Sequence, residues 1–328
     1  MTHKLMPGFL FITLGLASAA SAAFAHSLPQ AAATRDGDII RQSLYTFPSY
    51  RAAQRNTDVA RYATQAEYNA AVRDSRFHLY KLTYRSDGLK VIAYLYKPRQ
   101  TKGQKYPVII FNRGSAVRGD IAPELLSRFH RLAQAGFVIV APLLRQSDGG
   151  EGYDEMGGAE VKDLMNAAAL IHALPFADAD NLFLYGESRG GMMTYQALRD
   201  GFPAKAAAVI GAFTDLQALF DEHAADPPER RLRPERLWPD YQTRKSEILT
   251  RRSALQWPEK INAPILILHG GADASVSPLQ ALRLAEKLQV LGKPYELLIY
   301  AGDNHLLFHN RHDGDRRVVL WFKTHSRK

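Results

Sequence analysis

The chain has 328 residues and no cysteine; 46% of its residues are hydrophobic and 23% are charged. This composition is typical of a globular protein with a full-sized core and favours a folded chain over a disordered one. The lack of cysteine excludes disulfides, a cysteine nucleophile and thiolate metal sites. The formal net charge is +9, but no zinc-finger spacing, RNA-binding signature or basic heptad accompanies it, so we expect no nucleic-acid partner.

The first 25 residues have the pattern of an export signal. Lys4 precedes an apolar stretch from Phe9 to Leu16, and the small-residue site at 23–25 predicts cleavage before His26. An uncleaved anchor is the alternative, but the stretch is shorter than the roughly 18 apolar residues that cross a bilayer. We therefore expect a periplasmic or secreted protein with no membrane span after cleavage.

Residues 26–76 are polar and alanine-rich, and we expect them to form an N-terminal helical extension. Thr64 and Glu67 have the spacing of a capping box within it. From Phe77 the pattern changes to strands, and two β-rich runs, 77–84 and 91–96, flank an Asp-Gly turn and predict a hairpin. The catalytic domain is therefore predicted to span residues 77–328.

Strands and helices alternate after the hairpin. The predicted strands are 108–111, 137–140, 181–185, 206–210, 264–268 and 295–300, and the predicted helices are 123–135, 161–171, 192–198 and one that begins after Ser277. We expect Ser277 to cap this last helix, Gln280 to complete a capping box and Gly292 to end it.

This alternation predicts an α/β fold with a mostly parallel central sheet and helices on both faces. The alternation breaks between residues 213 and 261, which we expect to form a helical insert over the C-terminal edge of the sheet. Within it, residues 228–252 hold eight Arg or Lys and four Asp or Glu. They form either a cationic rim that attracts acidic substrates or a solvated helical face.

The only G-x-S-x-G in the chain is Gly186-Glu187-Ser188-Arg189-Gly190. It follows a predicted strand directly and opens a predicted helix, which is the context of a nucleophile elbow. Glycines are needed there because the strained turn that exposes the serine oxygen leaves no room for neighbouring Cβ atoms. Ser188 is therefore the predicted nucleophile; a glycine-rich turn with an incidental serine is the alternative.

A serine hydroxyl needs a base, and the base needs an orienting carboxylate. Asp273 and His305 each lie just past the end of a predicted buried strand, where ligand sites form in open α/β sheets. Asp303 rivals Asp273, but it is too close to His305 in sequence to approach the far side of the ring. We expect His269 to hold the loop of Asp273 rather than to serve as a second base.

Three further histidines, His309, His312 and His325, are expected to lie beyond the site. His305 and His309 have the i, i+4 spacing of metal ligands, but no Glu follows His305 as a zincin helix requires. We therefore predict no metal and no cofactor.

The tetrahedral intermediate needs hydrogen-bond donors for its oxyanion. One predicted donor is the backbone N–H of Arg189, directly after the nucleophile. The second is expected in the loop that follows strand 108–111, from the amide of Arg113 or Gly114, with the Asn112 side chain as a rival.

An acidic loop follows strand 137–140 and is expected to lie near the site. Its Asp154 and Glu155 are candidates for binding a substrate amine, or for pairing with Arg145 or Arg113. The sequence does not separate these two hypotheses.

With these residues placed, the chain resembles the catalytic domain of the prolyl oligopeptidase family of serine peptidases from about Tyr84 to Phe322. The most specific segments are 186–191, 264–273, 292–296 and 302–305. The resemblance implies an α/β-hydrolase fold, a triad of Ser188, Asp273 and His305, and cleavage of peptide bonds in small peptides through an acyl-enzyme.

Two departures from the family concern the substrate. Family endopeptidases and dipeptidyl peptidases carry a β-propeller that filters substrates, and the segment ahead of Phe77 is too short for one. Residues 112–115, Asn-Arg-Gly-Ser, replace the usual Gly-Gly run. Because propeller-less relatives include esterases and deacylases, a carboxylesterase or deacylase acting on small acyl esters is the alternative, and a catalytically silent binding protein is the third.

Overall fold

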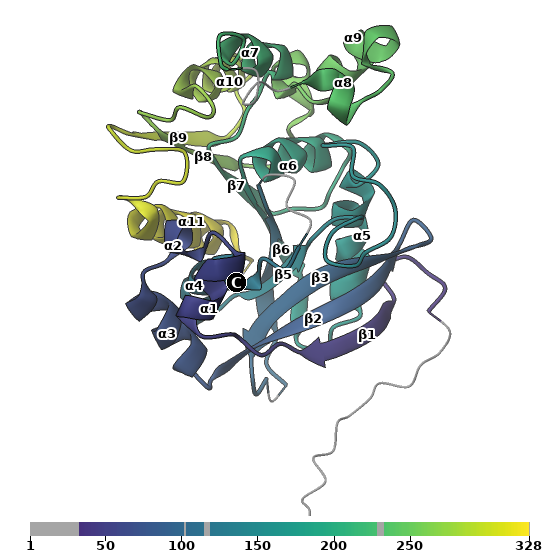
Figure 1. Cartoon of the computed structure of the whole chain (residues 1–328), viewed down its shortest axis with the longest axis vertical. Helices are drawn as coiled ribbons and strands as arrows, with labels where there is room; N and C mark the ends of the chain where they lie inside the picture. The colour runs from purple at the N-terminus through teal and green to yellow at the C-terminus, as the bar shows by residue number, and fades with distance from the viewer. Residues whose placement is uncertain (1–32, 102, 115–118, 228–232, 328) are drawn as a thin grey trace, which may run out of the picture. The chain divides into compact units, whose positions relative to one another are not determined.

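A computed structural model describes residues 33–101, 103–114, 119–227 and 233–327, so the predicted signal at 1–25 lies outside the described residues. The centre is a nine-stranded sheet with the order β1-β2-β3-β5-β4-β6-β7-β8-β9 (Figure 1). Its strands are β1 (Ile39–Leu44), β2 (Phe77–Ser86), β3 (Leu89–Pro98), β4 (Tyr106–Asn112), β5 (Val138–Pro142), β6 (Ala177–Glu187), β7 (Ala206–Ile210), β8 (Ile265–Gly270) and β9 (Tyr295–Tyr300).

The sheet is parallel from β5 to β9 and antiparallel at the other edge. Strands β1, β2 and β3 pair antiparallel, and β3 pairs antiparallel with β5. The predicted β2–β3 hairpin is confirmed, and it turns at Asp87 and Gly88 with φ angles of 55° and 79°. Positive φ at both turn residues matches the right-handed twist of the flanking strands.

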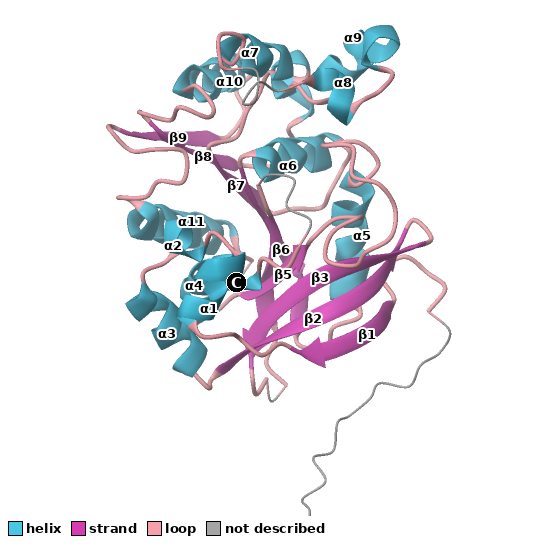
Figure 2. Cartoon of the chain, in the orientation of Figure 1, coloured by secondary structure: helices cyan, strands magenta, loops and turns pink. Residues whose placement is uncertain are grey.

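Helices cover both faces of the sheet, as predicted (Figure 2). The helices are α1 (Tyr50–Asn56), α2 (Val59–Tyr62), α3 (Gln65–Arg73), α4 (Ala122–Gln134), α5 (Val161–His172), α6 (Arg189–Arg199), α7 (Leu216–Glu222), α8 (Pro234–Leu237), α9 (Tyr241–Arg251), α10 (Pro278–Val290) and α11 (Arg311–His325). Within β4, Val108 and Ile110 face the core shared with α5, α6 and α10, whereas Ile109 and Phe111 face the core shared with α1–α4 and α11. The continuous apolar run of β4 therefore reflects burial on both sides.

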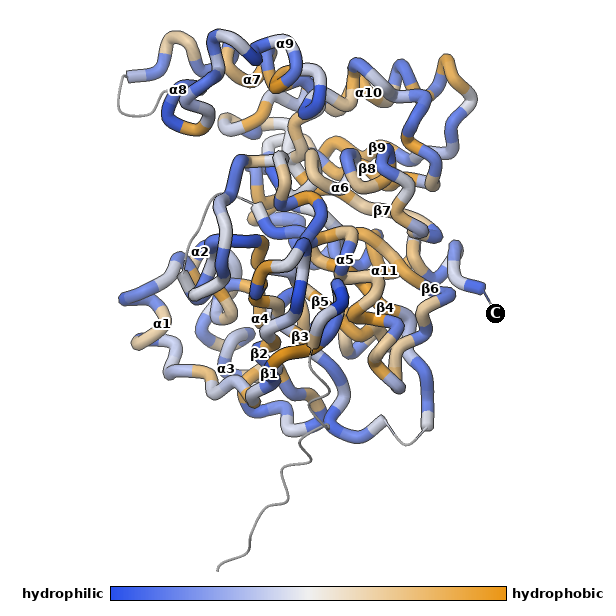
Figure 3. Tube along the Cα trace, turned by 90° about the vertical axis from the view of Figure 1, so that its right-hand side faces the viewer, coloured by the Kyte–Doolittle hydropathy of each residue, from blue (hydrophilic) through white to orange (hydrophobic). Residues whose placement is uncertain are grey.

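The segment between β7 and β8 is helical, with α7, α8, α9 and two 3₁₀ turns at Ala254–Gln256 and Pro258–Lys260. It contacts the loop after β5, since Trp238 Nε1 donates to the Glu155 carbonyl at 2.8 Å and Arg252 Nη2 donates to the same oxygen at 3.0 Å. Figure 3 shows α8 as largely hydrophilic and the central strands as hydrophobic. The predicted insert thus lies against a loop at the C-terminal edge of the sheet.

The N-terminal extension differs from the prediction because it contains a strand as well as three helices. β1 pairs with β2, with Arg41 opposite Thr83. Its side chains are half-buried or exposed throughout, so no period-2 hydrophobic pattern marks it, and backbone bonds to β2 hold this edge strand. The predicted capping box of Thr64 and Glu67 is present at the start of α3.

One predicted cap is wrong. Ser277 caps α10 as expected, but Gln280 does not complete a capping box. Its Oε1 instead accepts the backbone N–H groups of Thr214 and Asp215, each at 2.8 Å, and so ties α10 to the segment after β7. Among the described helices, none has both the length and the apolar character needed to cross a bilayer.

Candidate active site

Ser188 occupies the turn between β6 and α6, with φ 52° and ψ −121°. Only a few per cent of non-glycine residues adopt positive φ, so the turn is strained. The Ser188 N–H donates to the Ile210 carbonyl at 2.8 Å, which attaches the turn to the end of β7. A Cβ at Gly190 would lie 2.0 Å from the Asn112 carbonyl oxygen, so glycine is required for β4 to approach the helix.

Asp273 and His305 meet across the loops that follow β8 and β9. Asp273 Oδ2 lies 2.7 Å from His305 Nδ1, and Oδ1 accepts the N–H groups of Ser275 at 2.8 Å and Val276 at 3.0 Å. Burial alone would raise the pKa of Asp273. Hydrogen bonds from His269, His305 and Val276 outweigh it and hold the pKa well below its ordinary value.

The end of β7 connects His305 to the serine turn. Gly211 follows β7 with φ 56°, and a Cβ there would lie 2.9 Å from His305 Nδ1. The Ser188 backbone N–H bonds to Ile210, and the His305 ring lies against Gly211, so two consecutive residues at the end of β7 contact both segments. The geometry thus brings the predicted nucleophile, base and acid to one edge of the sheet.

The rival carboxylate is engaged elsewhere. Asp303 accepts the backbone N–H groups of Asn304, His309 and Asn310 within its own loop, at 2.9 to 3.2 Å.

The other histidines considered in the sequence analysis each contact a different part of the protein. His312 Nε2 lies 2.6 Å from a carboxylate oxygen of Glu67. His325 Nδ1 bonds to a carbonyl of its own helix, α11. His309 is part of the loop that Asp303 organises. His269 contacts Asp273 itself, with Nε2 3.1 Å from Oδ2.

The loop after β4 lies beside the predicted nucleophile. A Cβ at Gly114 would lie 3.2 Å from the Ser188 Cβ. The rival donor, the Asn112 side chain, is buried and donates to Thr194 Oγ1 of α6 at 2.8 Å. The Arg113 guanidinium points into the protein and donates to the Leu143 carbonyl at 3.0 Å. Its side chain is thus an anchor of this loop.

The residue after Ser188 is a buried arginine that the acidic loop surrounds. The Arg189 side chain is 2% exposed, and its guanidinium donates to both oxygens of Asp154, at 2.5 and 2.8 Å, and to Glu160 at 2.7 Å. Burial would raise the pKa of Asp154, but Arg189 holds it below its ordinary value; burial keeps the pKa of Glu160 raised.

This pairing contradicts the hypothesis that Asp154 binds a substrate amine. Asp154 pairs with Arg189, and its distance to Arg113 is 4.0 Å, whereas Arg145 pairs with Asp163 at 2.9 Å. Burial and the charge of Arg189 lower the pKa of Arg113 to about 10. The carboxylate of Asp154 is therefore neutralised within the protein rather than free for a substrate amine.

The residue before Ser188 is also a buried, paired charge. Glu187 forms an ion pair with Arg128 of α4, and Arg128 also donates to Asp315 of α11 at 2.9 Å. The sequence analysis identified neither flanking ion pair. Two buried ion pairs, one toward α4 and one toward the loop before α5, thus hold the turn on both sides of Ser188.

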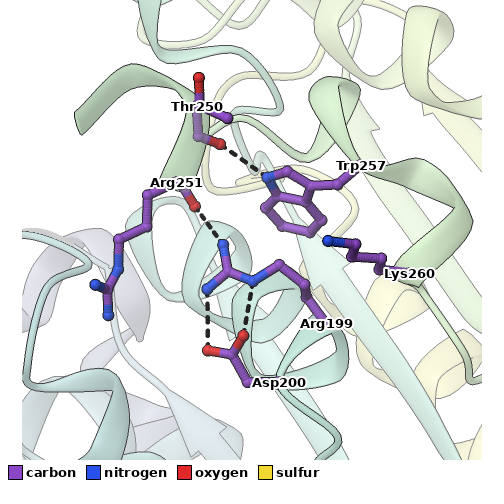
Figure 4. Close-up of a pocket in the computed structure, with 6 residues that line it drawn as sticks. All are labelled: Arg199, Asp200, Thr250, Arg251, Trp257 and Lys260. Atoms are coloured by element: carbon purple, nitrogen blue, oxygen red, sulfur yellow. Dashed lines mark hydrogen bonds and ion pairs between the residues drawn. The ribbon is translucent and has the colours of Figure 1, made fainter. Parts of the chain in front are cut away.

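A pocket of about 460 Å³ lies at the C-terminal end of α6, whereas Ser188 lies at its N-terminal end. Figure 4 shows the Arg199 guanidinium there held by Asp200 and by the Arg251 carbonyl. The same guanidinium lies 4.8 Å from the ring centre of Trp257. Its donors are used within the protein, so we assign no substrate to this pocket.

Comparison with known proteins identifies the family of the chain. Residues 123–328 match the profile of the prolyl oligopeptidase family. The chain is 30% identical over 228 residues to the uncharacterized peptidase YtmA of Bacillus subtilis, covering 69% of this chain and 86% of that protein. It is 25% identical to dipeptidyl-peptidase 5 of Porphyromonas gingivalis, over 68% of this chain and 35% of the relative.

Solved structures share the fold. Acylaminoacyl peptidase of Pyrococcus horikoshii superposes with a TM-score of 0.58 at 22% identity, over 80% of this chain and 43% of that one. Acetyl xylan esterase 1 of Thermoanaerobacterium superposes with a TM-score of 0.59 at 16% identity, over 78% of this chain and 92% of the esterase. The chain thus spans less than half of the larger peptidases and most of the two shorter proteins. The predicted α/β-hydrolase fold is confirmed, and the chain belongs to the prolyl oligopeptidase family of serine peptidases.

Proposed function

We propose that this serine hydrolase cleaves peptide bonds of small peptides, with Ser188 as nucleophile, His305 as base and Asp273 as orienting acid. The observation that carries the proposal is the 2.7 Å contact of His305 Nδ1 with Asp273, on the strand end that also holds the strained turn of Ser188. Strain, buried carboxylate and accessible imidazole together are what nucleophilic catalysis requires.

The proposed reaction proceeds through an acyl-enzyme. Asp273 is ionised, so the N–H at His305 Nδ1 donates a hydrogen bond to the carboxylate. His305 Nε2 is then the nitrogen that accepts the proton of Ser188. Ser188 Oγ then bonds to the substrate carbonyl carbon, and the imidazolium returns the proton to the leaving amine. Water then attacks the acyl-enzyme. His305 takes a proton from this water and returns it to Ser188, which releases the acid product.

The oxyanion of each tetrahedral intermediate needs two donors. We assign the first to the backbone N–H of Arg189, at the N-terminus of α6, and the second to the loop amide of Gly114 or Arg113. The closeness of Gly114 to Ser188 supports this assignment. The buried anchors of Arg113 and Arg189 support rigid amides, which lose no energy to reorganisation during the reaction.

Hydrolysis of small acyl esters is the second candidate. The observation that favours it is architectural, because the chain covers 92% of an esterase of the same fold. Kinship with named peptidases favours amide cleavage. A panel that pairs each short aminoacyl amide with the matching acyl ester separates the two through the ratio of kcat/KM values.

Labelling with a fluorophosphonate tests the mechanism. We expect one label, on Ser188, and we expect Ser188→Ala to lose both labelling and turnover of the preferred substrate. Labelling of another residue, or undiminished turnover by Ser188→Ala, contradicts the assignment.

We further propose that the protein is exported and acts in the periplasm or outside the cell. The support is the basic, apolar and small-residue order of residues 4–25. N-terminal sequencing of the protein purified from its native host is expected to begin at or near His26. A retained Met1 on envelope-bound protein contradicts cleavage.

A further inference from the structure

His269 lies at the end of β8, just before the loop that holds Asp273, and its imidazole is fully buried. Nε2 lies 3.1 Å from Asp273 Oδ2 and 3.0 Å from the Val276 carbonyl oxygen. Both neighbours are hydrogen-bond acceptors, because the low pKa of Asp273 keeps its carboxyl ionised. His269 Nε2 therefore carries a proton and donates it to them.

The two ring nitrogens of His269 have different surroundings. Nδ1 is buried and has no hydrogen-bond partner among the described residues. Nε2 is thus the ring nitrogen that interacts with the loop, and its proton lies between the Val276 carbonyl oxygen and Asp273 Oδ2.

The Asp273 carboxylate consequently has a donor at each of its acceptor positions. Oδ1 accepts two backbone N–H groups, from Ser275 and Val276, while Oδ2 accepts His305 and His269. The side chain is fully buried, so water does not replace a lost donor. His269 therefore controls both the orientation of Oδ2 and the charge that this oxygen presents to His305.

We propose that His269 is a positioning residue of the triad, whose Nε2–H fixes Asp273 Oδ2 against His305. This inference rests on the proposed function, because the orientation of His305 matters only if it is the base for Ser188. Loss of the donor frees the carboxylate to turn and lowers kcat. It also leaves more negative charge on Oδ2, which stabilises protonated His305 and moves the acid limb of kcat/KM to higher pH.

Other charged groups near this loop contact its backbone only. His223 Nε2 lies 2.9 Å from the Ser275 carbonyl oxygen, and Glu222 accepts the Ser277 N–H at 3.1 Å. Asp303 accepts the amides of its own loop. None of these contacts involves His269, so its replacement leaves them in place.

Two substitutions at His269 separate positioning from packing. His269→Leu fills the site without a donor. His269→Gln places an N–H the same number of bonds from the backbone as the histidine Nε2. For His269→Leu we expect kcat to fall roughly 10- to 100-fold, the value of a hydrogen bond to a charged group, with KM unchanged and the acid limb at higher pH. We expect His269→Gln to retain kcat and the wild-type pH profile.

The same Leu substitution in the Asp273→Asn background is the matched control. Without the carboxylate there is nothing to position, so we expect no further loss of kcat. An equal loss in both backgrounds, wild-type kcat in His269→Leu, or equal losses in Leu and Gln with no movement of the acid limb each overturn the proposal. If His269→Leu does not fold, His269→Asn, which is too short to reach Asp273, takes its place.

Labelling of the wild-type protein distinguishes the two levels of the argument. If fluorophosphonate does not label Ser188, the proposed function fails and the role of His269 fails with it. If Ser188 is labelled and the His269 variants give an overturning result, only the positioning role fails.

Discussion

Replacing Arg189 by methionine tests the buried ion pairs behind the nucleophile. The guanidinium donates three hydrogen bonds to Asp154 and Glu160, and its side chain is 2% exposed. Methionine keeps much of the apolar stem and removes the charge, so both carboxylates lose their cation inside the protein. Removal of one partner from a buried ion pair costs about 3–5 kcal/mol, and we expect the free energy of unfolding to fall by this amount.

The matched control is Arg244→Met in α9. Arg244 also donates three hydrogen bonds to two carboxylates, those of Asp240 and Glu247, but its side chain is 46% exposed. Water solvates these three groups when the pairs break, so we expect no measurable change in the unfolding midpoint.

The Arg189→Met deficit also depends on pH. Arg189 lowers the pKa values of Asp154 and Glu160 against the effect of burial. Without it, both pKa values rise in the folded state above those of the unfolded chain. The folded variant then binds more protons than the unfolded chain, so its stability falls as the pH rises through the raised pKa values. We expect a smaller deficit at about pH 5 than at about pH 8.

Urea unfolding followed by tryptophan fluorescence measures both effects, with wild type, Arg189→Met and Arg244→Met at each pH. A deficit of Arg189→Met no larger than that of Arg244→Met would refute the argument from burial. A deficit that is the same at both pH values would refute the account of the two carboxylates.

Three further predictions concern the proposed triad. Asp273→Asn is expected to cost roughly 10³–10⁴ in kcat, whereas Asp303→Asn, which changes a loop bond, is expected to cost much less; the reverse order in steady-state kinetics contradicts the choice of acid. Gly211→Ala and Gly292→Ala both place alanine at positive φ, 56° and 62°, but only the first Cβ meets His305. We expect similar losses of thermal stability and a fall of about 100-fold in kcat for Gly211→Ala alone; equal activities would show that the ring is not displaced. Because the pKa of Asp273 is held low, we expect kcat/KM to rise with pH in a single step as His305 loses its proton, and a second acidic step would show protonation of Asp273.

The elements that were predicted correctly are those whose sequence patterns depend on neighbouring residues in the chain. Val108 to Phe111 is apolar without interruption because both faces of β4 are buried, and the glycines around Ser188 reflect close approaches of the backbone. β1 was missed because backbone bonds to β2 hold it, and those bonds leave no mark on its side chains. Gln280 was misassigned because a tertiary contact with Thr214 outweighs its local capping signature.

The positions of the candidate site residues at one edge of the sheet were predictable for a related reason. Chain order and position at strand ends indicated Ser188, Asp273 and His305, since the C-terminal ends of parallel strands meet at one edge. The ion pairs were not predictable in this way. The chain holds 42 Lys and Arg and 33 Asp and Glu. Arg189 and Asp154 are 35 positions apart in sequence, and they meet only after the segment between them has folded into a loop, helix α5 and strand β6.

The order of strands in the sheet has a consequence for a chain that emerges N-terminus first from a ribosome. Most new strands find a neighbour already formed, but β4 is made before both of its neighbours, and β5 must then enter between β3 and β4. Sheet growth at one edge keeps most pairings local and limits the time that unpaired edges are exposed. His305 follows β9, the last strand of the sheet to be made. An emerging chain therefore carries the proposed nucleophile before its proposed base has been made, and the proposed triad cannot assemble until the sheet is complete.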